Sequence, residues 1–156
     1  MKICRDIRGQ RGVTAIVIAI VLPVLIAVVA LAVDVGYLAA TKNELQNIAD
    51  ASALAGARKL GSIYQTMSYE DQQAYVCDPA TIRNVAKDIA SKNIAGGKDN
   101  IIINNGDIII GDWDGATLTP TLAQPDAVEV TARRDGGAKA RIQTYFQRIF
   151  GIDTED

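Results

Sequence analysis

The chemistry that the sequence offers most directly is cation binding by carboxylates. Asp112 and Asp114 stand two residues apart in "GDWDG", and Asp107 precedes them closely. Calcium prefers such oxygen ligands, but an EF-hand loop needs them to alternate over about twelve residues and to end in a glutamate. The run "DWDGATLTPTLA" has no acid at its end. Turn formation at a strand end is therefore the favoured interpretation, with a metal site at Asp112 and Asp114 as the alternative.

Other reactive constellations are missing from the sequence. The chain has no histidine, so its serines have no imidazole base to activate them. "AGGKDN" lacks the spacing and the trailing Lys-Ser/Thr of a phosphate-binding loop. The net charge of −2 disfavours nucleic-acid binding, which needs a basic surface. We therefore predict a protein that is not an enzyme, uses no cofactor and binds no nucleic acid.

A long apolar stretch suggests that the chain works at a membrane. Residues 13–33 carry no charge, and as a helix they would extend about 31 Å, close to the thickness of a hydrocarbon core. The apolar part of a signal peptide is shorter, about 7–15 residues, and helical sequence continues here beyond Asp34. We therefore expect a retained anchor rather than a cleaved signal.

Basic residues before the apolar stretch predict its orientation. This N-terminal region has four basic residues and one acid: Lys2, Arg5, Arg8 and Arg11, and Asp6. An excess of Lys and Arg marks the cytoplasmic side. The N-terminus should then be cytoplasmic and the C-terminus extracytoplasmic, in a single-pass membrane protein.

The two cysteines fall on opposite sides of this predicted membrane. Cys4 precedes the apolar stretch and Cys77 follows it, so they cannot pair within one chain. Cys77 is either a buried thiol or a partner in an intermolecular disulfide, which an oxidising compartment would permit.

The elements after the membrane predict an α+β fold. Helical sequence continues to about residue 60, and its small residues in "ADASALAGA" suit close packing against another element. We divide the chain into a basic N-terminus (1–12), a transmembrane helix (13–33), its extracytoplasmic continuation (34–60) and a small α+β domain (61–156). The residues expected to bend this helix or to pack it closely are Pro23, Gly36, Ala49, Ser52, Ala53 and Gly56.

Local signals in the last segment predict one helix, a hairpin, a strand and a terminal helix. Asp78-Pro79 should cap and begin a helix. Asn105-Gly106 between two isoleucine runs predicts a two-residue hairpin turn that pairs Ile103 with Ile108. "AVEVTARRD" alternates as a half-exposed strand and "KARIQTYFQRIF" as an amphipathic helix. We expect a mainly antiparallel sheet packed on the long helix.

The segment "RGVTAIVIAIVLPVLIAVVALAVDVGYLAATKNELQNIADASALAGARKL" resembles the N-terminal part of TadE/TadG-like proteins of the tight-adherence (Flp) pilus assembly system. "IIIGDWDG", "PDAVEVTARRD" and "TYFQRIFG" resemble the later strands and terminal turn of TadG-like chains. The resemblance implies a pilin-like architecture and a non-enzymatic component of pilus assembly that is anchored in the bacterial inner membrane. Its partners would be the lipid bilayer, other pilus-assembly membrane proteins and, as an option, further copies of itself.

Two departures from this family pattern leave alternatives open. Prepilin-like relatives are cleaved after a glycine and carry a glutamate five residues on, but here Gly12-Val13 is followed by Val17 in that position. This favours an unprocessed TadG-like chain, and a filament subunit cleaved after Gly12 is the alternative. The chain also stops where relatives carry another strand, so a companion chain could donate that strand to an open sheet edge. An anchored ligand-binding or adhesive module is the third option.

Overall fold

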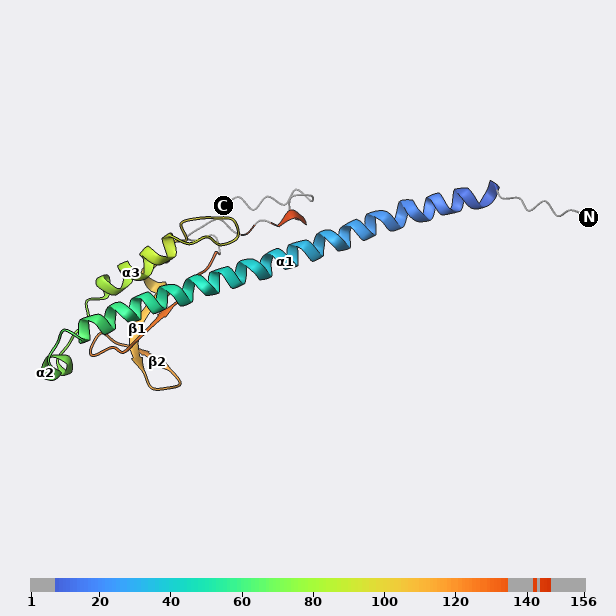
Figure 1. Cartoon of the computed structure of the whole chain (residues 1–156). Coiled ribbons are helices and arrows are strands. Elements are labelled where there is room, and N and C mark those ends of the chain that lie inside the picture. The colour runs from blue at the N-terminus through green and yellow to red at the C-terminus, as the bar shows by residue number, and fades with distance from the viewer. Residues whose placement is uncertain (1–7, 135–141, 143, 147–156) are drawn as a thin grey trace, which may run out of the picture. The chain divides into compact units, whose positions relative to one another are not determined.

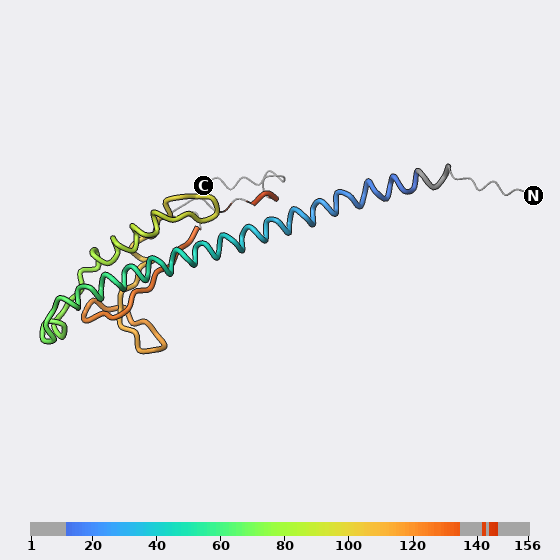
Figure 2. Tube along the Cα trace, viewed as in Figure 1, coloured from blue at the N-terminus to red at the C-terminus, as the bar shows by residue number. Residues whose placement is uncertain are grey.

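A computed structural model describes residues 8–134, 142 and 144–146. It divides into two compact units. The described part of the first unit comprises residues 8–37 and 144–146, and that of the second comprises residues 38–134 and 142. Figure 1 labels the elements, and Figure 2 follows the same path as a tube.

One helix, α1 (Arg8–Tyr64), makes up 57 residues of the chain. It continues through Pro23, which lies inside it. The predicted end near residue 60 is wrong by one turn, since α1 ends at Tyr64 and the Gln65 N–H still donates to the Gly61 carbonyl (3.0 Å). Packing explains the extension, because Ile63 and Tyr64 lie against a cluster of buried residues and hold the last turn in place.

The first unit contains the apolar half of α1. Side chains there are exposed all round the helix, with Val13 at 64%, Ile26 at 60% and Leu31 at 55%. Within the described residues, α1 is the one helix long and apolar enough to cross a membrane. These are the properties of a single-pass membrane protein.

The second unit begins with the other half of α1 and adds two shorter helices. Ser68 caps α2 (Tyr69–Gln73), and its hydroxyl oxygen accepts from the Asp71 N–H (3.2 Å). The predicted start of α3 (Pro79–Ser91) is confirmed, because the Asp78 carboxylate accepts from the N–H groups of Ala80 and Thr81. These bonds satisfy donors that a helix N-terminus otherwise leaves unpaired.

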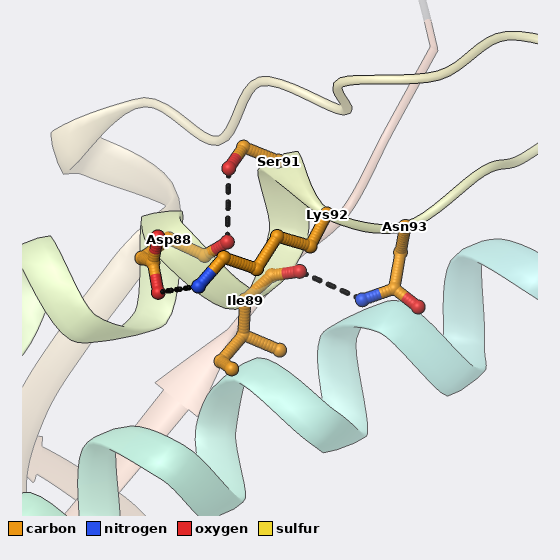
Figure 3. A network of polar contacts seen from close by, with 5 residues as sticks. All are labelled: Asp88, Ile89, Ser91, Lys92 and Asn93. Carbon is orange, nitrogen blue, oxygen red and sulfur yellow. Dashed lines mark hydrogen bonds and ion pairs between the residues drawn. The ribbon is translucent and has the colours of Figure 1, made fainter.

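Side chains also close the C-terminal end of α3 (Figure 3). The Asn93 amide donates to the Ile89 carbonyl (2.7 Å), and the Ser91 hydroxyl donates to the Asp88 carbonyl (2.9 Å). Lys92 forms an exposed ion pair with the Asp88 carboxylate (2.6 Å). The helix therefore ends in a fixed turn that leads back to the sheet.

The sheet has three antiparallel strands in the order β2-β1-β3. The central strand β1 (Ile108–Trp113) pairs with β2 (Leu118–Pro120) and with β3 (Ala127–Val130). The predicted strand in "AVEV" is confirmed, with Glu129 exposed and Val130 buried. The expected α+β class, a long helix packed on a small antiparallel sheet, is the fold observed.

The predicted hairpin at Asn105-Gly106 is wrong. These residues belong to a single 3₁₀ turn, η1 (Asn105–Asp107), and Ile103 has no strand partner. The Asp107 carboxylate decides this local structure, because it accepts from the Asn104 N–H (3.2 Å) and pairs with Arg133. A type I′ turn needs positive φ at both central residues, whereas the carboxylate stabilises a right-handed turn.

Two clusters form the core of the second unit. In the first, Ile48 of α1 packs with Ala86 and Ala90 of α3 and with Ile108 of β1. In the second, Leu60 of α1 packs with Ile82 and Ile110. The second half of α1 therefore packs against α3 and the inward face of the sheet through both clusters. Most of the predicted terminal helix lies outside the described residues. Of the part that is described, Tyr145 and Phe146 are helical, whereas Ile142 and Thr144 are not.

Candidate partner-binding site

A groove of about 510 Å³ opens between α1 and the β3 side of the sheet. One wall is the α1 face formed by Gln46, Ala49, Asp50 and Ala53. The other wall is β3 with Trp113 and Leu118, which extend the apolar surface along β1 and β2. The Trp113 side chain is 48% exposed. The groove therefore presents apolar surface to solvent within the folded unit.

The small residues of α1 divide between this groove and the interior. Ser52 and Gly56 are buried, and a Cβ on Gly56 would lie 3.1 Å from Val128 Cγ1. Gly56 thus allows the helix to approach the sheet closely. Ala49 is also buried and Ala53 packs partly against the first core cluster, but both line the floor of the groove, where their small side chains leave room beside the strand.

The edge of β3 opens toward this groove. Within residues 8–134, β3 pairs with β1 alone. The Thr131 N–H donates to the Asp107 carbonyl (2.8 Å), and antiparallel strands direct the main-chain groups of alternate residues to opposite sides. Those of Val128 and Val130 therefore point to the open side, where an added strand would lie about 4.8 Å away.

Acidic side chains stand at the rim of the groove. Asp50 and Glu129 are exposed and line it, and Gln46 Nε2 donates to Asp50 Oδ1 (2.9 Å). This rim complements a partner whose apolar side chains are flanked by Lys or Arg.

The remaining predicted helix positions lie in the first unit. Gly12, Val13, Pro23 and Gly36 are all exposed on α1. Nothing lies within 4 Å of a Cβ built on Gly12 or Gly36. Both glycines therefore leave helix surface uncovered. Processing at Gly12-Val13 stays a prediction, as does the bend at Pro23.

The candidate metal residues take part in turn structure. Asp114 Oδ1 accepts from the N–H groups of Ala116 (2.8 Å) and Thr117 (2.7 Å). These bonds, that from Thr117 foremost, lower the pKa of Asp114. Asp112 lies exposed on β1 opposite Thr119. Across the described residues, no group of three or more His, Cys, Asp or Glu residues gathers as metal ligands would.

Cys77 is a buried free thiol, the first of its two predicted states. It lies beside Tyr75, whose ring meets that of Tyr64 edge-on at 5.3 Å between centroids. Burial, as the main cause, raises the pKa of Tyr75 to about 12 and also raises the pKa of Cys77 and of Tyr64. A thiolate is the reactive form of cysteine, so this environment makes Cys77 a packing residue.

Sequence reasoning missed one connection in the first unit. Asp34 is only 3% exposed, and its carboxylate oxygens accept from the N–H groups of Tyr145 (2.8 Å) and Phe146 (2.7 Å). A lone acid directly after residues 13–33 was the available signal, since a carboxylate there needs donors.

Comparison with known families agrees with this geometry. A family model described as Flp pilus-assembly TadE/G-like matches residues 12–59, and one described as Tad-like Flp pilus-assembly matches residues 38–156. The chain belongs to the Tad-like Flp pilus-assembly family. No curated protein and no solved structure matches it.

The two family matches together cover both units of the chain. The TadE/G-like match spans the apolar half of α1 and the small residues that follow. The Tad-like match spans the entire second unit, including both walls of the groove. The chain is therefore a pilus-assembly component with one helix suited to a membrane and one folded unit suited to protein contacts.

Proposed function

We propose that this Tad-like chain is a non-enzymatic anchor and docking subunit of pilus assembly. Residues 13–33 hold it in the bacterial inner membrane, and the second unit works outside the cytoplasm. The observation that carries this proposal is the change of exposure along α1, where Leu25 is 56% exposed and Leu60 is 2% exposed. An apolar helix surface without a protein interior is stable in lipid.

The proposed orientation rests on charge. Four basic residues precede residue 13, and the positive-inside rule places them in the cytoplasm. Cys4 would then be cytoplasmic, while an exposed residue of the second unit, such as Ser62, would be extracytoplasmic.

We also propose that the groove receives an extended segment of another pilus-assembly protein. That segment would add to the edge of β3, place apolar side chains against Ala49 and Ala53, and place basic side chains near Asp50 and Glu129. Strand addition of this kind gives affinity through main-chain hydrogen bonds and specificity through side-chain pockets. A homo-oligomer formed through the same edge is the second arrangement to be tested.

Deletion of residues 13–33 tests the anchor. The full chain should remain in membranes after carbonate extraction, and the deletion variant should be recovered as soluble protein. Release of the full chain by carbonate would contradict the proposal. Intact mass of the extracted protein decides the filament alternative, because a cleaved subunit would begin at Val13.

Labelling with a membrane-impermeant maleimide tests the orientation. In a Cys77→Ser background, Cys4 should react only after the membrane is permeabilised. In a Cys4→Ser, Cys77→Ser, Ser62→Cys variant, the new thiol should react from outside in spheroplasts. The reverse pattern would place the second unit in the cytoplasm and contradict the proposal.

Filling the groove tests docking. Ala53→Trp should abolish surface pili while the unit stays folded, because Ala53 faces the groove beside β3. Leu54→Trp is the matched control, since Leu54 is 71% exposed and does not line the groove. Normal piliation with Ala53→Trp would contradict docking in the groove and leave the anchor intact.

A further inference from the structure

Asp34 links two parts of the first unit that lie far apart in the sequence. Its two carboxylate oxygens accept from consecutive main-chain N–H groups, those of Tyr145 and Phe146, at 2.8 and 2.7 Å. These partners are 111 and 112 residues away in the chain. Since the acceptor is a carboxylate, both bonds are of the strong, charge-assisted kind.

The position of Asp34 at the end of the apolar stretch explains why its carboxylate needs these bonds. It is the first charged residue after residues 13–33, and it is 3% exposed although the helix before it is exposed all round. A charge at the edge of the hydrocarbon core is costly unless hydrogen bonds satisfy it. The main chain at Tyr145 and Phe146 supplies two of those bonds.

The short donor–acceptor distances fix the depth of Tyr145 and Phe146. An α-helix advances about 1.5 Å per residue, so the Asp34 carboxylate lies within one turn of the end of the apolar stretch. Main-chain nitrogens less than 3 Å from its oxygens lie at the same level. If residues 13–33 span the bilayer, this level is the membrane–water boundary.

Side chains at this point suit that boundary. Tyr145 is 60% exposed, and Phe146 is half-buried. Tyrosine is enriched at both membrane interfaces, because its ring is apolar and its hydroxyl is wet. An exposed tyrosine held by its main chain beside Asp34 would contact the headgroup region.

We propose that Asp34 clamps the C-terminal segment to the end of the transmembrane helix, and that Tyr145 thereby contacts the phospholipid interface as a second lipid-binding element. This inference rests on the proposed membrane anchor. It goes beyond that anchor by assigning lipid contact to a segment that follows the whole folded unit in the sequence.

Fluorescence quenching by brominated lipids tests the lipid contact in the full chain. Trp113 is the one tryptophan of the chain, so a Trp113→Phe, Tyr145→Trp variant reports on position 145 alone. In phosphatidylcholine vesicles, lipids brominated near the headgroup should quench it strongly. Lipids brominated near the ends of the acyl chains should quench it weakly.

Variants on both sides of the bond test the clamp. Asp34→Ala should remove most of the quenching, and Asp34→Asn should remove part of it, because an amide offers one acceptor oxygen. Phe146→Pro removes one donor N–H and should also reduce quenching, with little further loss when combined with Asp34→Ala. Asp99→Ala, which changes an exposed acid of the second unit outside the groove, should leave quenching unchanged.

The outcomes separate the inference from the anchor. Vesicle flotation of each variant measures the anchor, and circular dichroism verifies that each variant is folded. A chain that floats with vesicles but shows no quenching at position 145 would overturn the inference alone. Quenching that survives in a folded Asp34→Ala variant would overturn the clamp, and a chain that does not float would overturn the proposed function.

Discussion

The two halves of α1 have the same secondary structure but different environments. In the first half, Leu25 is 56% exposed, and the apolar side chains around it have no protein interior to enter. In the second half, Ile48, Ser52 and Leu60 are at most 3% exposed, on one face that packs against α3 and the sheet. Residues 12–29 show no periodicity of burial, whereas burial with helical spacing begins at Ala30 and Asp34 and continues through the second half. Apolar residues alone therefore do not define a protein core, because a core also needs a second surface.

Replacing leucine by alanine in each half of α1 tests this difference in environment. It has the largest expected effect on the free energy of unfolding. Leu60→Ala should lower the free energy of unfolding of the second unit by about 3 kcal/mol, since it removes buried methyl groups and leaves a cavity. Leu25→Ala and Leu54→Ala remove the same atoms from exposed positions. Chemical unfolding in detergent, followed by Trp113 fluorescence, should show changes below about 0.5 kcal/mol for both. A large loss with Leu25→Ala would mean that the first half also packs in a protein interior.

Replacing glycine by leucine in each half of α1 tests the same difference in environment, with a smaller expected change in stability. Gly56→Leu should destabilise the second unit by about 2 kcal/mol, because a Cβ at position 56 already meets Val128 and Ile82 at 3.1 and 3.3 Å. Gly36→Leu places the same side chain where nothing lies within 4 Å, and it improves helix propensity. Its unfolding curve should match that of the wild type. Equal destabilisation by both variants would contradict the different environments.

The features that depend on neighbouring residues could be predicted from the sequence. The uncharged stretch ending at Val33 and the cap formed by Asp78 and Pro79 are readable from adjacent residues. The end of α1 was misplaced because Tyr64 is held by a bond to the distant Pro125 carbonyl (2.9 Å), not by its neighbours.

Long-range partners explain what the sequence did not predict. Asn105-Gly106 carries a strong hairpin signal, but Asp107 pairs with Arg133 and forms a different turn. The small residues of α1 were visible as a stripe, whereas only the fold shows that Gly56 faces the sheet and Ala53 faces a groove. Asp34 stands out in the sequence as a lone acid after the apolar stretch, but no local pattern names Tyr145 and Phe146 as its donors.

Removal of the Ser52 hydroxyl tests the buried half of α1 through a gain in stability, whereas the preceding substitutions there lower stability. Ser52 is fully buried, and among the described residues its Oγ has no hydrogen-bond partner. An unsatisfied buried hydroxyl is unfavourable, and alanine is the better helix former, so Ser52→Ala should raise stability by about 1 kcal/mol. Ser62→Ala is the control, because that exposed hydroxyl donates to the Lys59 carbonyl (2.7 Å). Destabilisation by Ser52→Ala would indicate that a bound chain supplies a partner to this hydroxyl.

Alkaline titration of Tyr75, Tyr64 and Cys77 gives the smallest effect on stability, because this effect should vanish at neutral pH. Burial holds the pKa of Tyr75 at about 12, above its ordinary value of 10.0, and raises the pKa of Tyr64 and of Cys77. Above about pH 9 the unfolded chain loses these protons first, whereas the folded unit keeps all three to higher pH, and keeps that of Tyr75 until about pH 12. Stability should therefore be constant up to about pH 9 and fall between there and pH 12, because the folded state binds more protons in that range.

Tyr75→Phe separates this titration from general alkaline damage. The variant lacks the most strongly shifted phenol, so its unfolding midpoint should fall less steeply above pH 9 than that of the wild type. Membrane association should not share this dependence, because residues 13–33 contain no ionisable side chain. Flotation of the chain between pH 7 and pH 11 measures that second response. A pH-dependent loss of flotation that follows the unfolding curve would mean that the folded unit contributes to membrane binding, and that the two halves of α1 do not act independently.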